Sequence, residues 1–144
     1  MTKKDDFDLQ NFLPYLLNQA AEESSLAFQN IYRDRYGMLR TDWRVLFHLG
    51  IYGRLTAKEI CERSKMHKTK ISRAVARLEE RRFLTRERDE ADRRLEYLEL
   101  TSAGRAAYTE LRGVAIDYDA ELAATFSFED VTVLRKLLHH LAKL

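Results

Sequence analysis

Residues 56–81 predict two amphipathic helices separated by a short polar turn, and this pair constrains the fold more than any other feature. The segment Thr56-Ala57-Lys58-Glu59 has the residue types of a capping box, in which threonine and glutamate side chains satisfy backbone N–H groups at a helix start. It predicts a helix over about 56–63. After a polar turn, Ile71, Val75 and Leu78 recur at steps of three and four and predict a second helix over about 68–81. This arrangement is a helix-turn-helix.

The rest of the chain predicts helices on both sides of this motif and one β-hairpin directly after it. Helical periodicity stops after the motif, and two β-prone segments enclose an acidic and basic tip. At 144 residues the chain fits one domain. We therefore expect a mainly α fold with a small β-hairpin wing, with its helix-turn-helix lobe over about 41–101. The predicted flanking elements are helices over about 11–36, 41–49, 102–125 and 128–143 and strands over about 83–89 and 93–101.

Charge is distributed unevenly along the sequence. Residues 54–94 hold 14 of the 25 Lys and Arg residues but 8 of the 23 Asp and Glu residues, a local net charge of +6. The remainder carries a net charge of −4. A cationic segment with anionic flanks is expected where one face meets phosphate. The alternative is a charged face that contacts only solvent.

The second helix of the motif carries donor side chains over its first two turns, the part of a helix that can reach base edges in the major groove of B-DNA. Arg73 can present two donors to guanine O6 and N7. Lys68, beside the positive N-terminal end of the helix, suits a phosphate. The candidate DNA-binding residues here are His67, Lys68, Thr69, Lys70, Ser72, Arg73 and Arg77.

The hairpin offers a second set of cations beside this helix. A two-stranded wing can place an arginine in the adjacent minor groove, where a narrow groove concentrates negative potential. Its candidates are Arg86, Arg88, Arg93 and Arg94. The alternative is a surface hairpin whose charges neutralise one another, through Glu87, Asp89, Glu90 and Asp92. Both interpretations can hold at once, because an aspartate that pairs with one arginine can orient the other.

Several other classes of function find no support in the sequence. It has no glycine-rich phosphate loop, no nucleophile beside a base and no isolated carboxylate pair, so we expect no enzyme activity and no cofactor. Cys61 is the single cysteine and is expected to pack in the core, and His139 and His140 are adjacent and so face different ways, which argues against a metal site. No apolar run approaches the roughly 18 residues of a membrane span, and the first residues lack a secretory signal. We expect a cytoplasmic protein.

These motifs resemble the MarR family (multiple-antibiotic-resistance-type regulators) from Leu13 to the C-terminus. The resemblance is carried by the order and spacing of several pieces, each of them common alone. The pieces are Thr41-Asp42-Trp43-Arg44-Val45-Leu46, Ile71-Ser72-Arg73 followed by Leu78-Glu79, Asp89-Glu90-Ala91-Asp92-Arg93-Arg94 and Leu100-Thr101-Ser102-Ala103-Gly104. One departure is Arg82, where the family usually has glycine. A left-handed turn there would strain a non-glycine residue, which leaves the end of the helix open.

The resemblance implies a homodimer formed by helices at about 11–36 and 102–143, with two recognition helices in successive major grooves of a pseudo-palindrome. It implies that Arg94 lies at the minor groove and that Asp92 steadies it. It also implies repression, relieved by a small aromatic effector bound between the dimer scaffold and the lobe. Residues that could line such a site, or be ordinary core, are Tyr15, Trp43, Phe47, His48, Tyr108 and Arg112.

A second hypothesis is a helical interaction module that keeps the winged-helix shape without binding DNA. It predicts a neutral or acidic face on the second helix of the motif. Lys68, Lys70, Arg73 and Arg77 argue against it.

Overall fold

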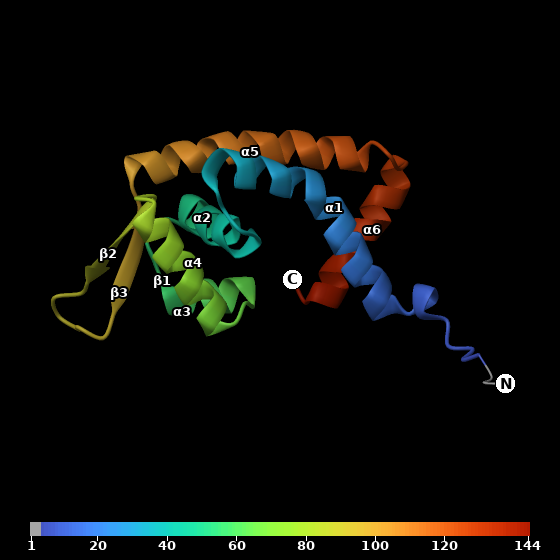
Figure 1. The fold of residues 1–144 in the computed structure, drawn as a ribbon, viewed down its shortest axis with the longest axis horizontal. Coiled ribbons are helices and arrows are strands. Elements are labelled where there is room, and N and C mark those ends of the chain that lie inside the picture. Colours follow the sequence, from blue (N-terminus) through green and yellow to red (C-terminus); the bar gives the residue numbers. More distant parts are fainter. Residues whose placement is uncertain (1–3) are drawn as a thin grey trace.

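The computed structural model describes residues 4–144 and has six α-helices, one short 3-10 helix and a small antiparallel sheet within that range (Figure 1). The predicted fold class, mainly helical with a small β-hairpin wing, is confirmed. The elements in chain order are a 3-10 helix Leu9–Asn11, α1 Leu13–Tyr36, α2 Arg40–Tyr52, β1 Leu55–Thr56, α3 Ala57–Ser64, α4 Lys68–Glu80, β2 Leu84–Arg88, β3 Glu96–Leu100, α5 Ser102–Ala123 and α6 Phe128–Ala142.

The helix-turn-helix begins with the capping box that the sequence predicts. The Glu59 backbone N–H donates to Thr56 Oγ1 at 3.2 Å, and the Thr56 backbone N–H donates to Glu59 Oε1 at 3.4 Å. At the start of α4, His67 is the cap, because its Nδ1 accepts a hydrogen bond of 3.1 Å from the Thr69 backbone N–H. Each helix of the motif therefore begins at a residue whose side chain satisfies an otherwise unpaired backbone donor.

The sheet has the strand order β1-β3-β2, and both pairings are antiparallel. Leu98 in the central strand lies opposite Leu55 of β1 and opposite Arg86 of β2. The two-residue strand β1 was not predicted, because a segment this short has no periodicity of its own. It joins the wing, formed by β2, β3 and the turn between them, to the start of α3.

The molecule has a lobe at one end and a helical scaffold that extends away from it (Figure 1). The lobe contains α2, α3, α4 and the sheet. The long helix α5 crosses above the lobe, the C-terminal half of α1 lies beneath α5, and α6 lies beside the N-terminal half of α1 at the far end. The core lies in the lobe and where α1 and α5 meet it, and its fully buried side chains include Tyr32, Leu46, Ile60, Ile71, Leu78, Leu98 and Leu111.

The boundaries of α1 and α2 differ from the predicted ones, as do the ends of several other elements. Asn11 ends the short 3-10 helix, so α1 begins two residues later, at Leu13. Helix α2 begins at Arg40 and continues through Gly50 to Tyr52, beyond the predicted end at residue 49. Gly50 is needed inside the helix because a Cβ atom there would lie 2.5 Å from the ring of Tyr108. The glycine therefore permits a close contact between α2 and this ring.

Arg82 adopts the left-handed conformation that glycine favours, with φ of 64°. Its backbone N–H donates to the Glu79 carbonyl at 2.9 Å, and its carbonyl accepts a hydrogen bond of 2.7 Å from Thr101 Oγ1. The end of α4 therefore keeps a left-handed turn despite the arginine. Across residues 4–144, no helix combines the length and the apolar character that a membrane crossing requires.

Candidate nucleic-acid interface

Helix α4 has one buried face and one face made of donors. Ile71, Ala74, Val75 and Leu78 are buried and hold the helix against the lobe. The side chains between them are exposed: Lys68, Thr69, Lys70, Ser72 and Arg73. Within residues 4–144 none of the three cations in this set has a hydrogen-bonding or ion-pair partner. Their donors are available to an external acceptor.

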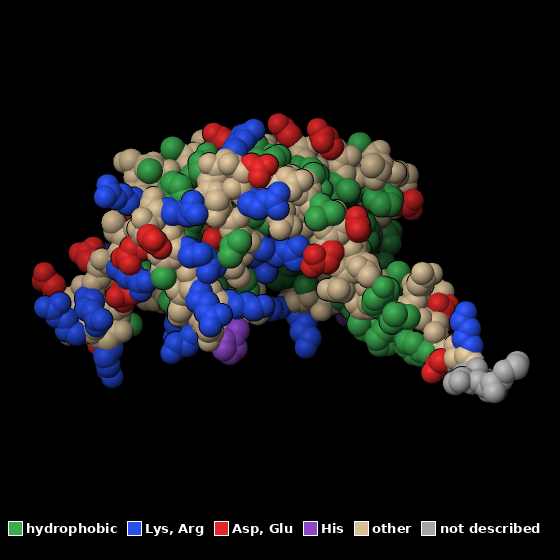
Figure 2. All heavy atoms as spheres, viewed as in Figure 1, with side chains coloured by type: hydrophobic (Ala, Val, Ile, Leu, Met, Phe, Trp, Pro, Cys, Tyr) green, Lys and Arg blue, Asp and Glu red, His purple; other side chains and the backbone are tan. Residues whose placement is uncertain are grey.

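Lys and Arg side chains gather along one edge of the molecule, over α3, α4 and the wing (Figure 2). The wing lies beside α4 on this edge, so the helix and the wing can meet one extended partner (Figure 1). His67 is also exposed at the start of α4. Its ring, however, has the capping role described above, which residue type alone did not reveal.

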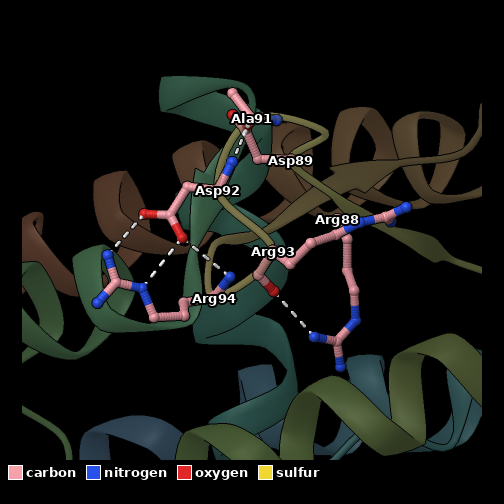
Figure 3. A network of polar contacts seen from close by, with 6 residues as sticks. All are labelled: Arg88, Asp89, Ala91, Asp92, Arg93 and Arg94. Atoms are coloured by element: carbon pink, nitrogen blue, oxygen red, sulfur yellow. Dashed lines mark hydrogen bonds and ion pairs between the residues drawn. The ribbon is translucent and has the colours of Figure 1, made fainter.

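The turn of the wing is held in one conformation by its own polar contacts (Figure 3). Asp89 Oδ1 accepts hydrogen bonds from the backbone N–H groups of Ala91, at 2.7 Å, and Asp92, at 3.0 Å. Arg88 Nη1 donates to the Arg93 carbonyl at 3.0 Å. Two of the predicted wing residues, Arg88 and Asp92, thus shape the turn, and the side chain of Arg93 is exposed beside them.

Arg94 extends from this turn and is oriented by Asp92. Its Nε lies 3.1 Å from Asp92 Oδ1 and its Nη2 lies 3.3 Å from Asp92 Oδ2 (Figure 3). The Arg94 side chain is nevertheless 91% exposed. The hydrogen bond from the Arg94 side chain, together with that from its backbone N–H, lowers the pKa of Asp92. The carboxylate stays ionised and directs the arginine without covering it.

Arg86 is neutralised, but by carboxylates other than the four that the sequence suggested. It lies between two carboxylates, with Nε 3.0 Å from Glu79 of α4 and Nη1 3.1 Å from Glu96 of β3. Partial burial opposes its charge, but the hydrogen bonds to these carboxylates outweigh burial and raise the pKa of Arg86. Arg86 therefore joins the wing to α4. In the wing, carboxylates neutralise Arg86, whereas the side chain of Arg94 extends into solvent.

Arg77, predicted as a DNA-binding residue, forms a contact within the protein. Its guanidinium turns toward α2 and forms an ion pair with Asp42, whose Oδ1 lies 2.8 Å from Arg77 Nη2. Asp42 is only 1% exposed. The buried carboxylate of Asp42 is costly to leave unpaired, and Arg77 supplies its positive partner. The proposed DNA-contacting residues therefore do not include Arg77.

The predicted effector residues are only partly brought together. A cavity of about 260 Å³ on the outer side of α2 is lined by Trp43, Arg44, Phe47, His48, Ile51 and Tyr52. Tyr108 is buried behind it, with its ring 5.2 Å from that of Phe47, while Tyr15 and Arg112 do not line it. Arg44, Ile51 and Tyr52 also line the cavity, although they were not among the predicted residues. They lie three or four residues from Phe47 or His48 on the same helix face, so helical spacing could have identified them.

Arg44 gives this cavity a cationic wall. Partial burial lowers the pKa of Arg44, with a further contribution from nearby Arg40, and within residues 4–144 its side chain has no hydrogen-bonding partner. His48 Nδ1 lies 2.6 Å from the Arg44 carbonyl oxygen. The cavity combines aromatic rings with one half-buried cation.

A larger apolar groove of about 580 Å³ lies on the scaffold between α1, α5 and α6. No side chain of α6 is buried. The groove-lining residues are mostly apolar and include Leu17, Ala20, Ala21, Leu122, Phe126, Val131, Leu134 and Leu138. Within residues 4–144, no cluster of three or more His, Cys, Asp or Glu residues could hold a metal ion.

Comparisons with known proteins agree with this geometry. Residues 36–95 match the model of the MarR family. YwoH, an uncharacterized HTH-type transcriptional regulator of Bacillus subtilis, is 28% identical over 118 residues, which span 81% of this chain and 85% of YwoH.

Solved structures share the whole fold. A probable transcriptional regulator from Pseudomonas aeruginosa is 26% identical, with a TM-score of 0.79 over 93% of this chain and 99% of that one. BpsR of Bordetella bronchiseptica, whose DNA binding is regulated by 6-hydroxynicotinic acid, has a TM-score of 0.86 over 97% of this chain and 99% of its own. At 20% identity, BpsR shows the fold alone.

Proposed function

We propose that this chain is a MarR-type transcriptional regulator, as the match of residues 36–95 supports, and that it binds specific double-stranded DNA sequences. The observation that carries the proposal is the outer face of α4, where Lys68, Lys70 and Arg73 are exposed and unpaired within residues 4–144. A helix with free donors on its first two turns fits the major groove. Arg94 is exposed on the wing and paired with Asp92, and this supports its proposed contact with the adjacent minor groove.

The competing hypothesis, an interaction module that does not bind DNA, needs a neutral or acidic face on α4. The exposed charged residues of its first two turns are all cations. Cationic donors beside small polar residues favour phosphate and base contacts over a generic protein partner.

We propose that the protein acts as a homodimer on a pseudo-palindromic operator. The exposed apolar groove between α1, α5 and α6 supports this, because a second copy would cover it. A two-fold axis through the scaffold gives two copies of α4, which can enter successive major grooves. Such a compact dimer would occlude a promoter, so the proposed regulatory effect is repression.

We propose that a small aromatic effector releases the DNA by binding in the cavity on α2. The rings of Trp43 and Phe47 suit an aromatic group, and half-buried Arg44 suits an anionic substituent. A screen of phenolic and aromatic acids for release of bound DNA tests this, with Arg44→Ala as the variant expected to lose the response while still binding DNA.

The decisive experiment is selection of bound sequences from a random duplex pool, followed by titration of Arg73→Ala against the enriched operator. Loss of a bidentate contact to guanine should weaken specific binding by about 1–3 kcal/mol, roughly 5- to 150-fold, and relax the preference at that base pair. Binding of the wild type should fall with salt at a log–log slope of about −0.9 per neutralised phosphate.

The matched control is Arg33→Ala, which removes an exposed arginine from the scaffold helix α1. It should bind the operator as the wild type does. Unchanged affinity of Arg73→Ala would remove Arg73 from base reading, and a pool with no enriched sequence would favour the interaction-module hypothesis.

A further inference from the structure

Asp42 is the one buried charged residue in residues 4–144, and it connects α2 to the recognition helix α4. Its Oδ2 accepts a hydrogen bond of 2.9 Å from the Leu39 backbone N–H and so caps α2. It also accepts three hydrogen bonds from Arg77 of α4: Nε donates to Oδ1 at 2.9 Å and to Oδ2 at 3.1 Å, and Nη2 donates to Oδ1 at 2.8 Å.

These hydrogen bonds fix the orientation of α4 relative to α2, which the other contacts between the two helices do not do. The buried face of α4 is apolar, and apolar burial is largely non-directional. A planar guanidinium on a carboxylate has a narrow range of favourable geometries. The buried position of Asp42 also makes it costly to leave its charge unpaired. The pair therefore restricts the rotation of α4 about its own axis.

Arg77 lies one helical turn after Arg73, so the rotation of α4 determines where the Arg73 side chain emerges. We propose that Asp42 is a positioning residue for DNA recognition, which acts through Arg77 to hold the donor face of α4 toward DNA. This inference rests on the proposed function. It also assigns Arg77 a role within the protein in place of a contact with DNA.

The test compares Asp42→Asn, Arg77→Gln and the double variant, each shown to be folded at the working temperature by circular dichroism. Fluorescence anisotropy then gives the affinity for the selected operator and for a random duplex of equal length, over a series of salt concentrations. The control is Glu110→Gln, which removes the exposed ion pair between Arg35 of α1 and Glu110 of α5, 2.6 Å long, without touching α4.

We expect each single variant to weaken operator binding about tenfold or more while random-duplex binding changes much less. The salt slope should stay unchanged, because no phosphate contact is lost. The double variant should be no weaker than the weaker single variant, because both changes remove one interaction. The control should match the wild type in every measurement.

A direct DNA contact by Arg77 predicts a different pattern, which would overturn the inference. Arg77→Gln would then flatten the salt slope by about 0.9, and Asp42→Asn would bind as tightly as the wild type or more tightly. Unchanged operator affinity in the folded single variants would overturn it as well.

If the single variants do not fold, the apolar pair Asp42→Leu with Arg77→Met replaces the ion pair with packing of similar volume, an exchange that buried pairs often tolerate. This variant should fold and should lose operator preference. Wild-type operator affinity in this variant would contradict the positioning role. A wild-type protein that enriches no sequence would instead contradict the proposed function itself.

Discussion

At the residue scale, Arg82 stores backbone strain at the junction between α4 and the wing. Its φ of 64° lies in the left-handed region, which costs a non-glycine residue about 1–2 kcal/mol. The hydrogen bonds of Arg82 use only its backbone N–H and carbonyl groups, so a glycine can keep them. The sequence showed that this position departs from the family pattern, and the structure shows that the chain keeps the turn and bears the strain.

Arg82→Gly should therefore stabilise the fold. Relief of strain is partly offset by the greater freedom of glycine in the unfolded chain, about 0.4–1 kcal/mol, which leaves a net gain of about 0.5–1 kcal/mol. Thermal unfolding should shift upward by roughly 1–4 °C for a chain of this size. Arg82→Ala removes the same side chain and keeps the strain, so it should show no such gain. Equal melting temperatures for the two variants would contradict this account.

At the scale of elements, α5 packs closely against the residue that precedes β2 of the wing, at Gly104. A Cβ atom there would lie 1.9 Å from the Phe83 carbonyl oxygen. That oxygen accepts a hydrogen bond of 3.1 Å from the Thr101 backbone N–H, so it cannot move without disturbing the start of α5. Gly113, farther along the same helix, has nothing within 4 Å of such a Cβ.

The two glycines of α5 should respond in opposite directions to alanine. Gly104→Ala should destabilise the protein by about 1–3 kcal/mol, because the start of α5 must shift away from the wing. Gly113→Ala should stabilise it by about 0.5–1 kcal/mol through helix propensity. Urea unfolding of both variants measures the difference. A Gly104→Ala protein as stable as the wild type would mean that α5 is free to move relative to the wing.

The helices were predictable because apolar residues recur along them with helical spacing, and the recognition helix, predicted over 68–81, is observed as Lys68–Glu80. Side-chain partners across elements were not predictable. Nothing local to Arg77 indicates a buried carboxylate 35 residues earlier, and nothing local to Arg86 indicates that Glu79 and Glu96 enclose it. The periodicity of α4 identified Ile71 as core, but an arginine next to that stripe can turn either way.

At the scale of the whole molecule, α6 has little packing within one chain. It has 15 residues, none of them buried. An isolated helix of this length is marginal in water, and helices in proteins are stabilised mainly by packing of an apolar face. The apolar face of α6 borders the groove on the scaffold, so packing against a second copy would supply the missing stabilisation.

Replacing Leu134 and Leu138 together with lysine should dissociate the proposed dimer. Both leucines line the groove, and four unpaired charges would be buried across a two-fold interface. Sedimentation equilibrium should show a dimer for the wild type and a monomer for the variant, and circular dichroism should show a loss of helix of up to the length of α6. The operator affinity should fall in parallel, because one recognition helix reads only half of a two-fold site.

Thr109→Lys adds a lysine at an exposed position of α5 outside the groove and should remain dimeric. A wild-type protein that sediments as a monomer at micromolar concentration would refute the two-fold model, and a variant that stays dimeric would place the interface on a different surface.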